Sequence, residues 1–238
     1  MHRSFTFPIS LALALLLAAC SALPSQNLQR SSRAQIRKVW VAPIGVPQHA
    51  QVSIANPIGA GFGIVGNLVE SRRAAGAGQE LEKLLTKVSY DLRASLQRSV
   101  TVAVRKAGFT VVPATSDRPD SDRARFLRQY PSDTHADAYL DVYATYLGFE
   151  APQSSTDYRP RIEIATRIVS ARTHQTLFQA HIVYGAAATT DDDAVLVRSD
   201  DGAHFRDRTA LSAHPATTAR ALQSAIDAVG WELTKRLM

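Results

Sequence analysis

Residues 138–150, AYLDVYATYLGFE, alternate apolar and polar side chains, and this alternation decides the fold. Leu140 and Val142 fall on one face of an extended chain, whereas Asp141 and Tyr143 fall on the other. Apolar residues that recur at every second position are typical of a half-buried β-strand. The stretch therefore predicts a strand that packs one of its faces on a hydrophobic core.

Two later stretches repeat this alternation, at residues 161–172 (RIEIATRIVSAR) and at residues 176–185. The short connection at 173–175 between them suits a hairpin. Shorter apolar runs at 36–44 and 109–112 predict two more strands. Alternation of this kind indicates antiparallel strands that are covered on one side only.

Two amphipathic helices complete the pattern. Apolar residues recur at steps of three and four over residues 81–107, and Gly108 follows as the expected C-terminal cap, so a single long helix is predicted there. A second helix is expected from Pro215 to the end of the sequence, after a short strand at 194–198. The predicted fold class is α+β, a mostly antiparallel sheet with the long helix and the C-terminal helix packed on one face.

Composition limits the function classes. The chain has 238 residues, 45% of them apolar and 20% charged, and a formal net charge of +6. These values exclude a chain that is largely disordered and a polytopic membrane protein. The only cysteine, Cys20, excludes an intramolecular disulfide framework and a site built from several thiolates.

The N-terminal segment gives the most specific signal. His2 and Arg3 precede the apolar stretch Phe5–Leu17, which ends in Leu17-Ala18-Ala19-Cys20. The stretch is shorter than the roughly 20 residues of a membrane-spanning helix and has the length of a secretory signal. Small residues directly before a cysteine resemble the lipobox of bacterial lipoproteins.

That resemblance implies cleavage between Ala19 and Cys20, a diacylated Cys20 thiol and an acylated amine, with acyl chains such as palmitate. Residues 1–19 would then be the signal peptide, 20–35 the lipidated cysteine with a polar tether, and 36–238 one periplasmic domain. Ser21, in place of the aspartate that favours inner-membrane retention in such lipoproteins, implies the periplasmic face of the outer membrane.

The element order and the texture of the strands after Ala107-Gly108-Phe109 resemble the periplasmic domain of CsgG-like (curli-secretion) and TolB N-terminal-like lipoproteins. The resemblance implies an accessory protein of the cell envelope that acts in assembly, secretion or scaffolding through protein contacts. Its expected partners are the membrane, through the acyl chains, and an unidentified envelope protein. Homo-oligomerisation stays open, and neither a nucleic-acid partner nor an enzymatic activity is expected.

A glycine-rich segment precedes the long helix, and it offers two interpretations. Its residues match the spacing G-x-G-x-x-G, but Asn56-Pro57 interrupts any strand that would lead into a dinucleotide site. The remaining interpretations are a tightly packed loop and a contact surface for a partner or the membrane. The candidate contact residues are Gly59, Gly61, Phe62, Gly63, Ile64, Val65 and Gly66.

The alternative function is a periplasmic ligand-binding or hydrolytic domain with a pocket near Tyr139, Tyr143 and His181. The histidines lack the spacings of known metal motifs, and a G-x-S-x-G nucleophile motif is missing from the sequence. The sequence therefore predicts no catalytic, cofactor-binding or metal-binding residues.

Overall fold

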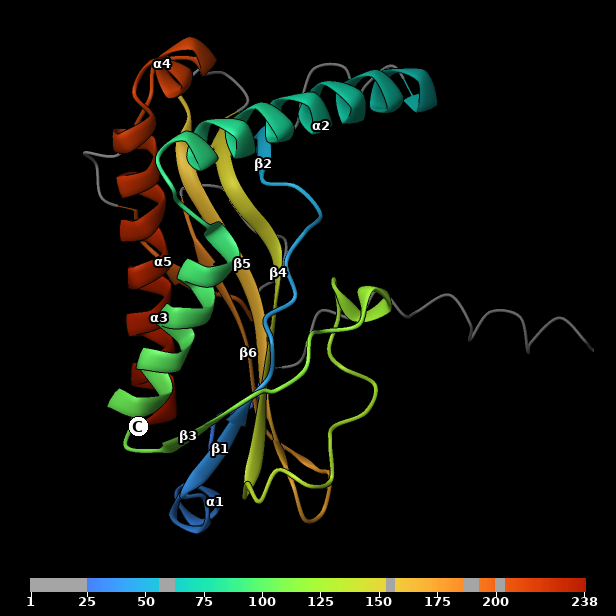
Figure 1. Ribbon diagram of the computed structural model, residues 1–238, viewed down its shortest axis with the longest axis vertical. Helices are drawn as coiled ribbons and strands as arrows, with labels where there is room; N and C mark the ends of the chain where they lie inside the picture. The colour runs from blue at the N-terminus through green and yellow to red at the C-terminus, as the bar shows by residue number, and fades with distance from the viewer. Residues whose placement is uncertain (1–24, 56–62, 153–156, 186–192, 200–203) are drawn as a thin grey trace, which may run out of the picture.

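The molecule has two main layers, a mixed sheet and a pair of helices on one face of it (Figure 1). The computed structural model describes residues 25–55, 63–152, 157–185, 193–199 and 204–238. Helices α3 (Leu92–Lys106) and α5 (Pro215–Leu237) lie side by side on the sheet. The α+β class predicted from the sequence is confirmed.

Three long antiparallel strands form the centre of the sheet. They are β4 (Ala138–Ala151), β5 (Arg159–Ser170) and β6 (Thr176–Tyr184), and they confirm the three predicted strands within two residues at each end. The alternating residues of these strands that face the helices are fully buried, among them Leu140, Ile164 and Ile182. The main core therefore lies between the sheet and the helices.

Short parallel strands extend this centre. β1 (Lys38–Val41) pairs with β4 and with β3 (Thr110–Pro113), and β7 (Val195–Val197) pairs with β6. The resulting order is β3-β1-β4-β5-β6-β7. A further strand that the sequence did not predict, β2 (Gln51–Ile54), pairs with the far end of β4.

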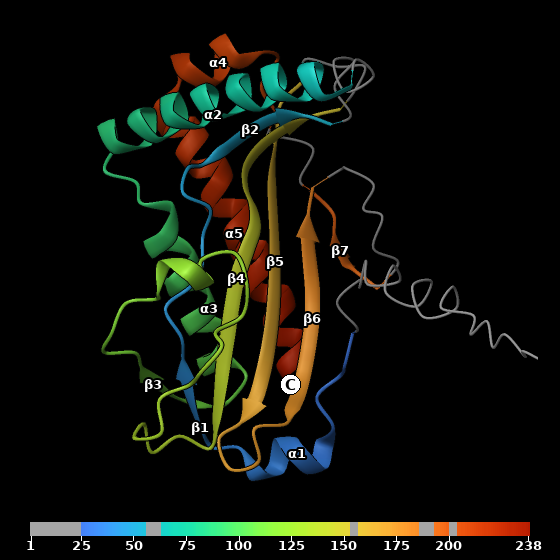
Figure 2. The same ribbon diagram turned by 90° about the vertical axis from the view of Figure 1, so that its right-hand side faces the viewer.

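The predicted single helix over residues 81–107 is wrong, because the chain bends between two helices. Helix α2 (Gly63–Lys87) ends before Ser89, whose φ of 55° lies in the left-handed region. Asp91 then begins α3, since its side chain accepts a hydrogen bond from the Ala94 amide at 2.9 Å. As a result α2 crosses one end of the sheet (Figure 2), and its N-terminal half extends beyond it (Figure 1).

Helix α5 confirms the predicted C-terminal helix and approaches α3 closely. Gly230 makes the approach possible, because a Cβ at this position would lie 2.2 Å from the Ser99 hydroxyl. Ser99 also donates a hydrogen bond to the Ile226 carbonyl at 3.1 Å. A short helix, α4 (Arg208–Ala213), precedes α5. The buried stripe of α5 includes Leu222, Ile226, Val229, Leu233 and Leu237, each with no exposed surface.

The expectation that the sheet is covered on one side only is wrong at the β1 end. Residues 114–137, which include the 3₁₀ turn η3 (Asp120–Asp122), lie over the opposite face. A second small core forms there, from Trp40, Ala42, Leu127, Tyr139 and Val169. The aromatic side chains on the polar face of β4 anchor this covering segment, which explains why that face also carries tyrosines.

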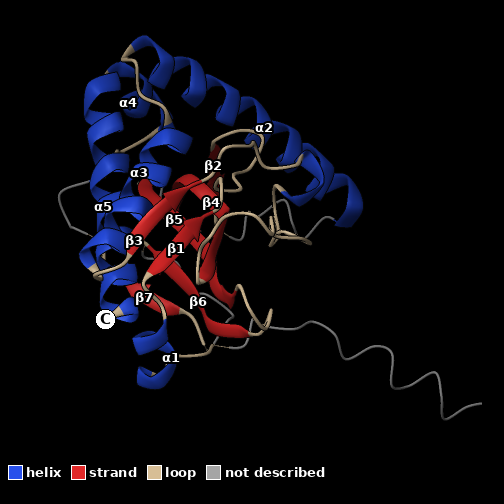
Figure 3. Cartoon of the chain, turned by 60° about the horizontal axis from the view of Figure 1, so that its bottom comes forward, coloured by secondary structure: helices blue, strands red, loops and turns tan. Residues whose placement is uncertain are grey.

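The tether expected over residues 20–35 is ordered in its C-terminal part. Gln26 exchanges two backbone hydrogen bonds with Gln179 of β6, and residues Arg30–Gln35 form helix α1. Helix α1 lies across the end of the sheet beside the C-terminus of the chain (Figure 3). The segment expected to be a tether is therefore bound to the domain from Gln26 onward.

Candidate functional site

The lipid attachment and cleavage residues, Ala19 and Cys20, lie outside the described residues. Their position is limited by the chain, because Gln26 is fixed on β6 by the backbone bonds to Gln179 and by a side-chain bond to the Thr176 carbonyl at 3.0 Å. Six residue steps of at most about 3.5 Å separate Cys20 from Gln26, so the chain allows at most roughly 20 Å between their Cα atoms.

Only part of the candidate contact segment belongs to the described residues. Gly59, Gly61 and Phe62 lie outside it, whereas residues 63–66 form the first turn of α2. These four residues are helical and not part of a loop. They belong to the half of α2 that extends beyond the sheet in Figure 1.

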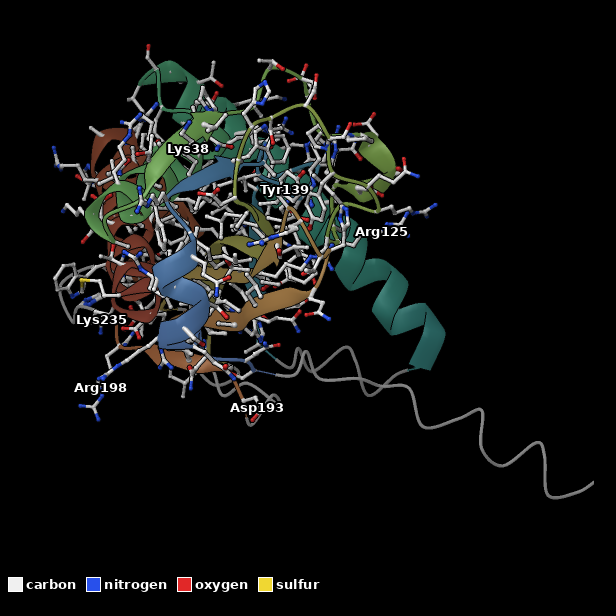
Figure 4. The ribbon with its side chains drawn as sticks, turned by 90° about the horizontal axis from the view of Figure 1, so that it is seen from below. Lys38, Arg125, Tyr139, Asp193, Arg198 and Lys235 are labelled. Carbon is white, nitrogen blue, oxygen red and sulfur yellow. The ribbon has the colours of Figure 1, made fainter. Side chains whose placement is uncertain are left out.

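The residues of the alternative pocket share one sheet face, but packing closes the space around the tyrosines. Tyr139 is 2% exposed, stacks on Tyr130 with ring centroids 4.7 Å apart, and donates a hydrogen bond to the Pro131 carbonyl at 2.8 Å. Tyr143 packs edge-on against Phe126 at 4.9 Å. In Figure 4, Tyr139 lies toward the covering segment that carries Arg125. The structure thus gives both tyrosines packing partners.

A fully buried carboxylate, Asp141, lies between these tyrosines. Its Oδ1 accepts from Arg118 Nη1 at 2.9 Å, and its Oδ2 accepts from the Leu127 amide at 2.6 Å and from the Tyr130 hydroxyl at 2.9 Å. Burial, followed by the nearby charge of Asp141, raises the pKa of Tyr130 far above its usual value. The network holds the covering segment on the sheet and keeps the Tyr130 hydroxyl protonated.

His181 belongs to a second polar group on the same face, nearer the other end of β5. Its Nε2 lies 2.8 Å from Glu163 Oε1, and Arg161 Nη2 lies 3.0 Å from Glu163 Oε2. Burial by itself would raise the pKa of Glu163, but the hydrogen bonds from His181 and Arg161 outweigh it and the pKa falls below its usual value. Arg161 also pairs with Glu150, so one guanidinium bridges carboxylates on the neighbouring strands β4 and β5.

A cavity that the sequence did not indicate lies at the corner between α2 and α3. Its volume is about 570 Å³, and its apolar wall includes Leu85 and Leu147. Glu82 forms its polar rim with His49, because Glu82 Oε2 lies 2.9 Å from His49 Nδ1 while Glu82 Oε1 accepts from the Ala50 amide. Polar side chains, among them Asp91 and Arg93, line the cavity as well. Glu82 and His49 are 33 residues apart in the chain, so no local motif could reveal their pair.

No helix in the described part of the chain is both long enough and apolar enough to cross a membrane. The same residues contain no group of three or more histidine, cysteine or carboxylate side chains that could hold a metal ion.

The structure is an α+β domain with a docked N-terminal segment. Comparisons with known proteins do not narrow the class of protein further. No protein-family model and no curated protein matches the chain. The solved structure of protein XCC0632 from Xanthomonas campestris, described with the family model DUF330, is similar at 10% identity and a TM-score of 0.43, over 84% of this chain and 83% of that chain. Lipoprotein GNA1162 from Neisseria meningitidis is similar at 13% identity and a TM-score of 0.31, over 69% of this chain and 86% of that chain. Likenesses at this level assign neither a family nor an activity.

Proposed function

We propose that the protein is a lipid-anchored accessory protein on the periplasmic face of the outer membrane, which acts through protein contacts and not through catalysis. One observation carries the proposal: an uncharged apolar stretch of signal-peptide length ends in Leu17-Ala18-Ala19-Cys20, and this cysteine is the only one in the chain. Two or more acyl chains on one residue anchor a protein stably, whereas a single chain binds reversibly.

The docked N-terminal segment limits the distance between the folded domain and its lipid anchor. Because Gln26 is bound to β6, the folded domain stays within about 20 Å of the lipidated residue. Confinement at this distance raises the effective concentration of the domain for any partner in the same membrane, without a new contact. The function we infer is therefore display of a folded surface close to the bilayer.

We assign the displayed contact to the segment that begins at Gly59 and continues into the first turn of α2. This turn, residues 63–66, lies in the part of α2 that extends beyond the sheet. The partner is a second envelope protein or a second copy of this chain, and the crosslinking experiment below distinguishes the two.

Substitution of Cys20 by serine tests the anchor. We expect a carbonate wash to release the Cys20→Ser variant from membranes. Mass spectrometry of the wild-type protein should find an acylated Cys20 at the N-terminus. Ser21→Ala is the control and should stay in the outer membrane, while Ser21→Asp should shift toward the inner membrane. An unmodified Cys20 thiol in the processed wild-type protein would refute the proposal.

Site-specific photo-crosslinking tests the contact. A photoreactive residue at Phe62 or Ile64 should give a discrete adduct in intact cells, and the same residue at Gln79, which is exposed on the packed half of α2, should not. An adduct of twice the monomer mass identifies a second copy. Equal labelling at Gln79 would contradict the assignment.

A further inference from the structure

We propose that the end of the domain where α1, α3 and α5 meet lies against an anionic phospholipid bilayer. This inference rests on the proposed lipid anchor and adds the orientation of the domain and the lipid chemistry that it recognises. We call this end the basal surface. It is defined by exposed basic side chains from five sequence regions: Arg30, Arg37, Lys38, Arg105, Lys106, Arg172, Lys235 and Arg236.

The fold brings these regions together and fixes them. Helices α3 and α5 run in the same direction and end side by side, and α1 lies against both ends (Figures 1 and 3). Arg33 of α1 donates to the Ala107 carbonyl after α3 and to the Leu237 carbonyl of α5. Figure 4 looks at this end of the molecule and shows Lys38 and Lys235 there. The positive charge is therefore a fixed surface and not a property of a free tail.

Few carboxylates oppose this charge in the described part of the chain. Glu232 pairs with Lys235 and with Arg236, and Asp137 accepts from the backbone amides of Arg37 and Lys38. Asp133 lies in the segment that leads into β4. The basic side chains outnumber these acidic ones, so the basal surface stays positive and suits lipid phosphates.

Exposed apolar side chains lie beside the charges. Trp231 is 56% exposed one turn before Lys235 on α5, and Val102 is 44% exposed one turn before Lys106 on α3. Residues four apart share one face of a helix, so each apolar side chain has a lysine next to it. Tryptophan beside lysine is the combination that prefers the boundary between lipid headgroups and acyl chains.

The position of the lipid anchor indicates that a membrane covers the basal surface. Gln26 is bound to Thr176, the first residue of β6, which lies at the same end of the sheet as α1 (Figure 2). The acyl chains on Cys20 therefore reach the bilayer from a point beside the basal surface. The projecting half of α2 lies at the opposite end, facing away from the lipids.

Fluorescence quenching of the lipidated protein in vesicles tests this orientation. The chain has two tryptophans, and Trp40 is only 4% exposed, so lipids with brominated acyl chains should quench Trp231 selectively. We expect quenching in vesicles that contain phosphatidylglycerol and its loss in vesicles of phosphatidylcholine alone. Trp231→Phe should abolish the quenched signal, and high salt should reduce it.

Charge reversal supplies the matched control. Lys106→Glu with Lys235→Glu should abolish quenching in anionic vesicles, since each basic residue near such a surface changes partitioning by roughly five-fold. Lys83→Glu with Lys87→Glu reverses two exposed lysines on α2 and should leave quenching unchanged. Thermal melts of both variants check that they fold.

Each outcome has one meaning. Quenching that is the same for both lipids, or that survives the Lys106 and Lys235 reversal, overturns the basal surface, as does its absence in a protein whose lipidation is confirmed. Failure of the anchor appears separately, as an unmodified Cys20 by mass spectrometry, and the unlipidated protein should then still bind anionic vesicles in a salt-dependent way.

Discussion

Arg33 donates a hydrogen bond through Nε to the carbonyl oxygen of Leu237, 3.2 Å away and 204 residues later in the chain. The same guanidinium donates to the Ala107 carbonyl and lies 3.8 Å from the centroid of the Phe109 ring. The last carbonyls of a helix lack partners within it and carry the negative end of its dipole. One cation therefore caps two parallel helices and ties the N-terminal segment to the core.

Removal of this guanidinium should weaken the docking of α1. We expect Arg33→Ala to lower the free energy of unfolding by about 1–3 kcal/mol, because it removes two charge-assisted hydrogen bonds and the contact with Phe109. Arg30→Ala, an exposed residue of the same helix, should change it by less than about 0.5 kcal/mol. Denaturant unfolding measures both variants, and similar values for the two would contradict the capping role.

The buried Asp141 should matter more for stability than any exposed carboxylate. Asp141→Asn leaves the Arg118 charge, whose side chain is 3% exposed, without its counter-ion, and we expect a loss of about 3–5 kcal/mol. Asp120→Asn is the control, because Asp120 is 86% exposed and its pair with Arg123 should contribute less than about 1 kcal/mol. Thermal unfolding and proteolysis within residues 114–137 report the effect. An intact covering segment in Asp141→Asn would disprove its role as a clamp.

The sequence predicted those parts of the fold that depend on periodicity. The alternation in β4, β5 and β6 and the stripe of α5 are local signals that tertiary contacts reinforce. The break between α2 and α3 was missed because Leu85, Val88 and Leu92 keep helical spacing across it. The signal that could have revealed it is the capping residue Asp91, three positions before the amide that it binds.

Other features could not be predicted from local patterns. Strand β2 has four residues and exists through its pairing with β4, where Gly148 allows the approach, since a Cβ there would lie 1.8 Å from the Gln51 carbonyl oxygen. The polar segment before Ile36 has no periodicity, and its order comes from the distant partners of Gln26 and Arg33. The candidate contact residues stay a prediction, because a partner surface leaves no trace in the packing of one chain.

The Glu163 carboxyl should make the protein sensitive to acid. Its pKa is lowered from the usual 4.5, so the folded state favours the charged form. The corresponding stability is present above the unfolded pKa and is lost as the pH falls through the lower, folded value. We therefore expect Glu163→Gln to reduce stability at pH 7 by about 1–3 kcal/mol and to flatten its decline between about pH 5 and 3. Glu80→Gln, at an exposed position, should change stability at pH 7 by less than about 1 kcal/mol. An unchanged pH profile for Glu163→Gln would exclude this linkage.

Two glycines in α2 should respond in opposite directions to the same substitution. At Gly76 a new Cβ meets no atom within 4 Å, so Gly76→Ala should raise stability by about 0.5–1 kcal/mol through helix propensity alone. At Gly78 the Cβ would lie 2.0 Å from the Ala50 carbonyl oxygen, which is backbone and cannot move aside without displacing the chain that leads into β2. We expect Gly78→Ala to lower stability by about 1–3 kcal/mol. Both residues lie in the same helix, two positions apart, so the difference between their melting temperatures isolates the close approach. A stabilising effect at both positions would show that α2 does not cross the chain at residue 50 as described.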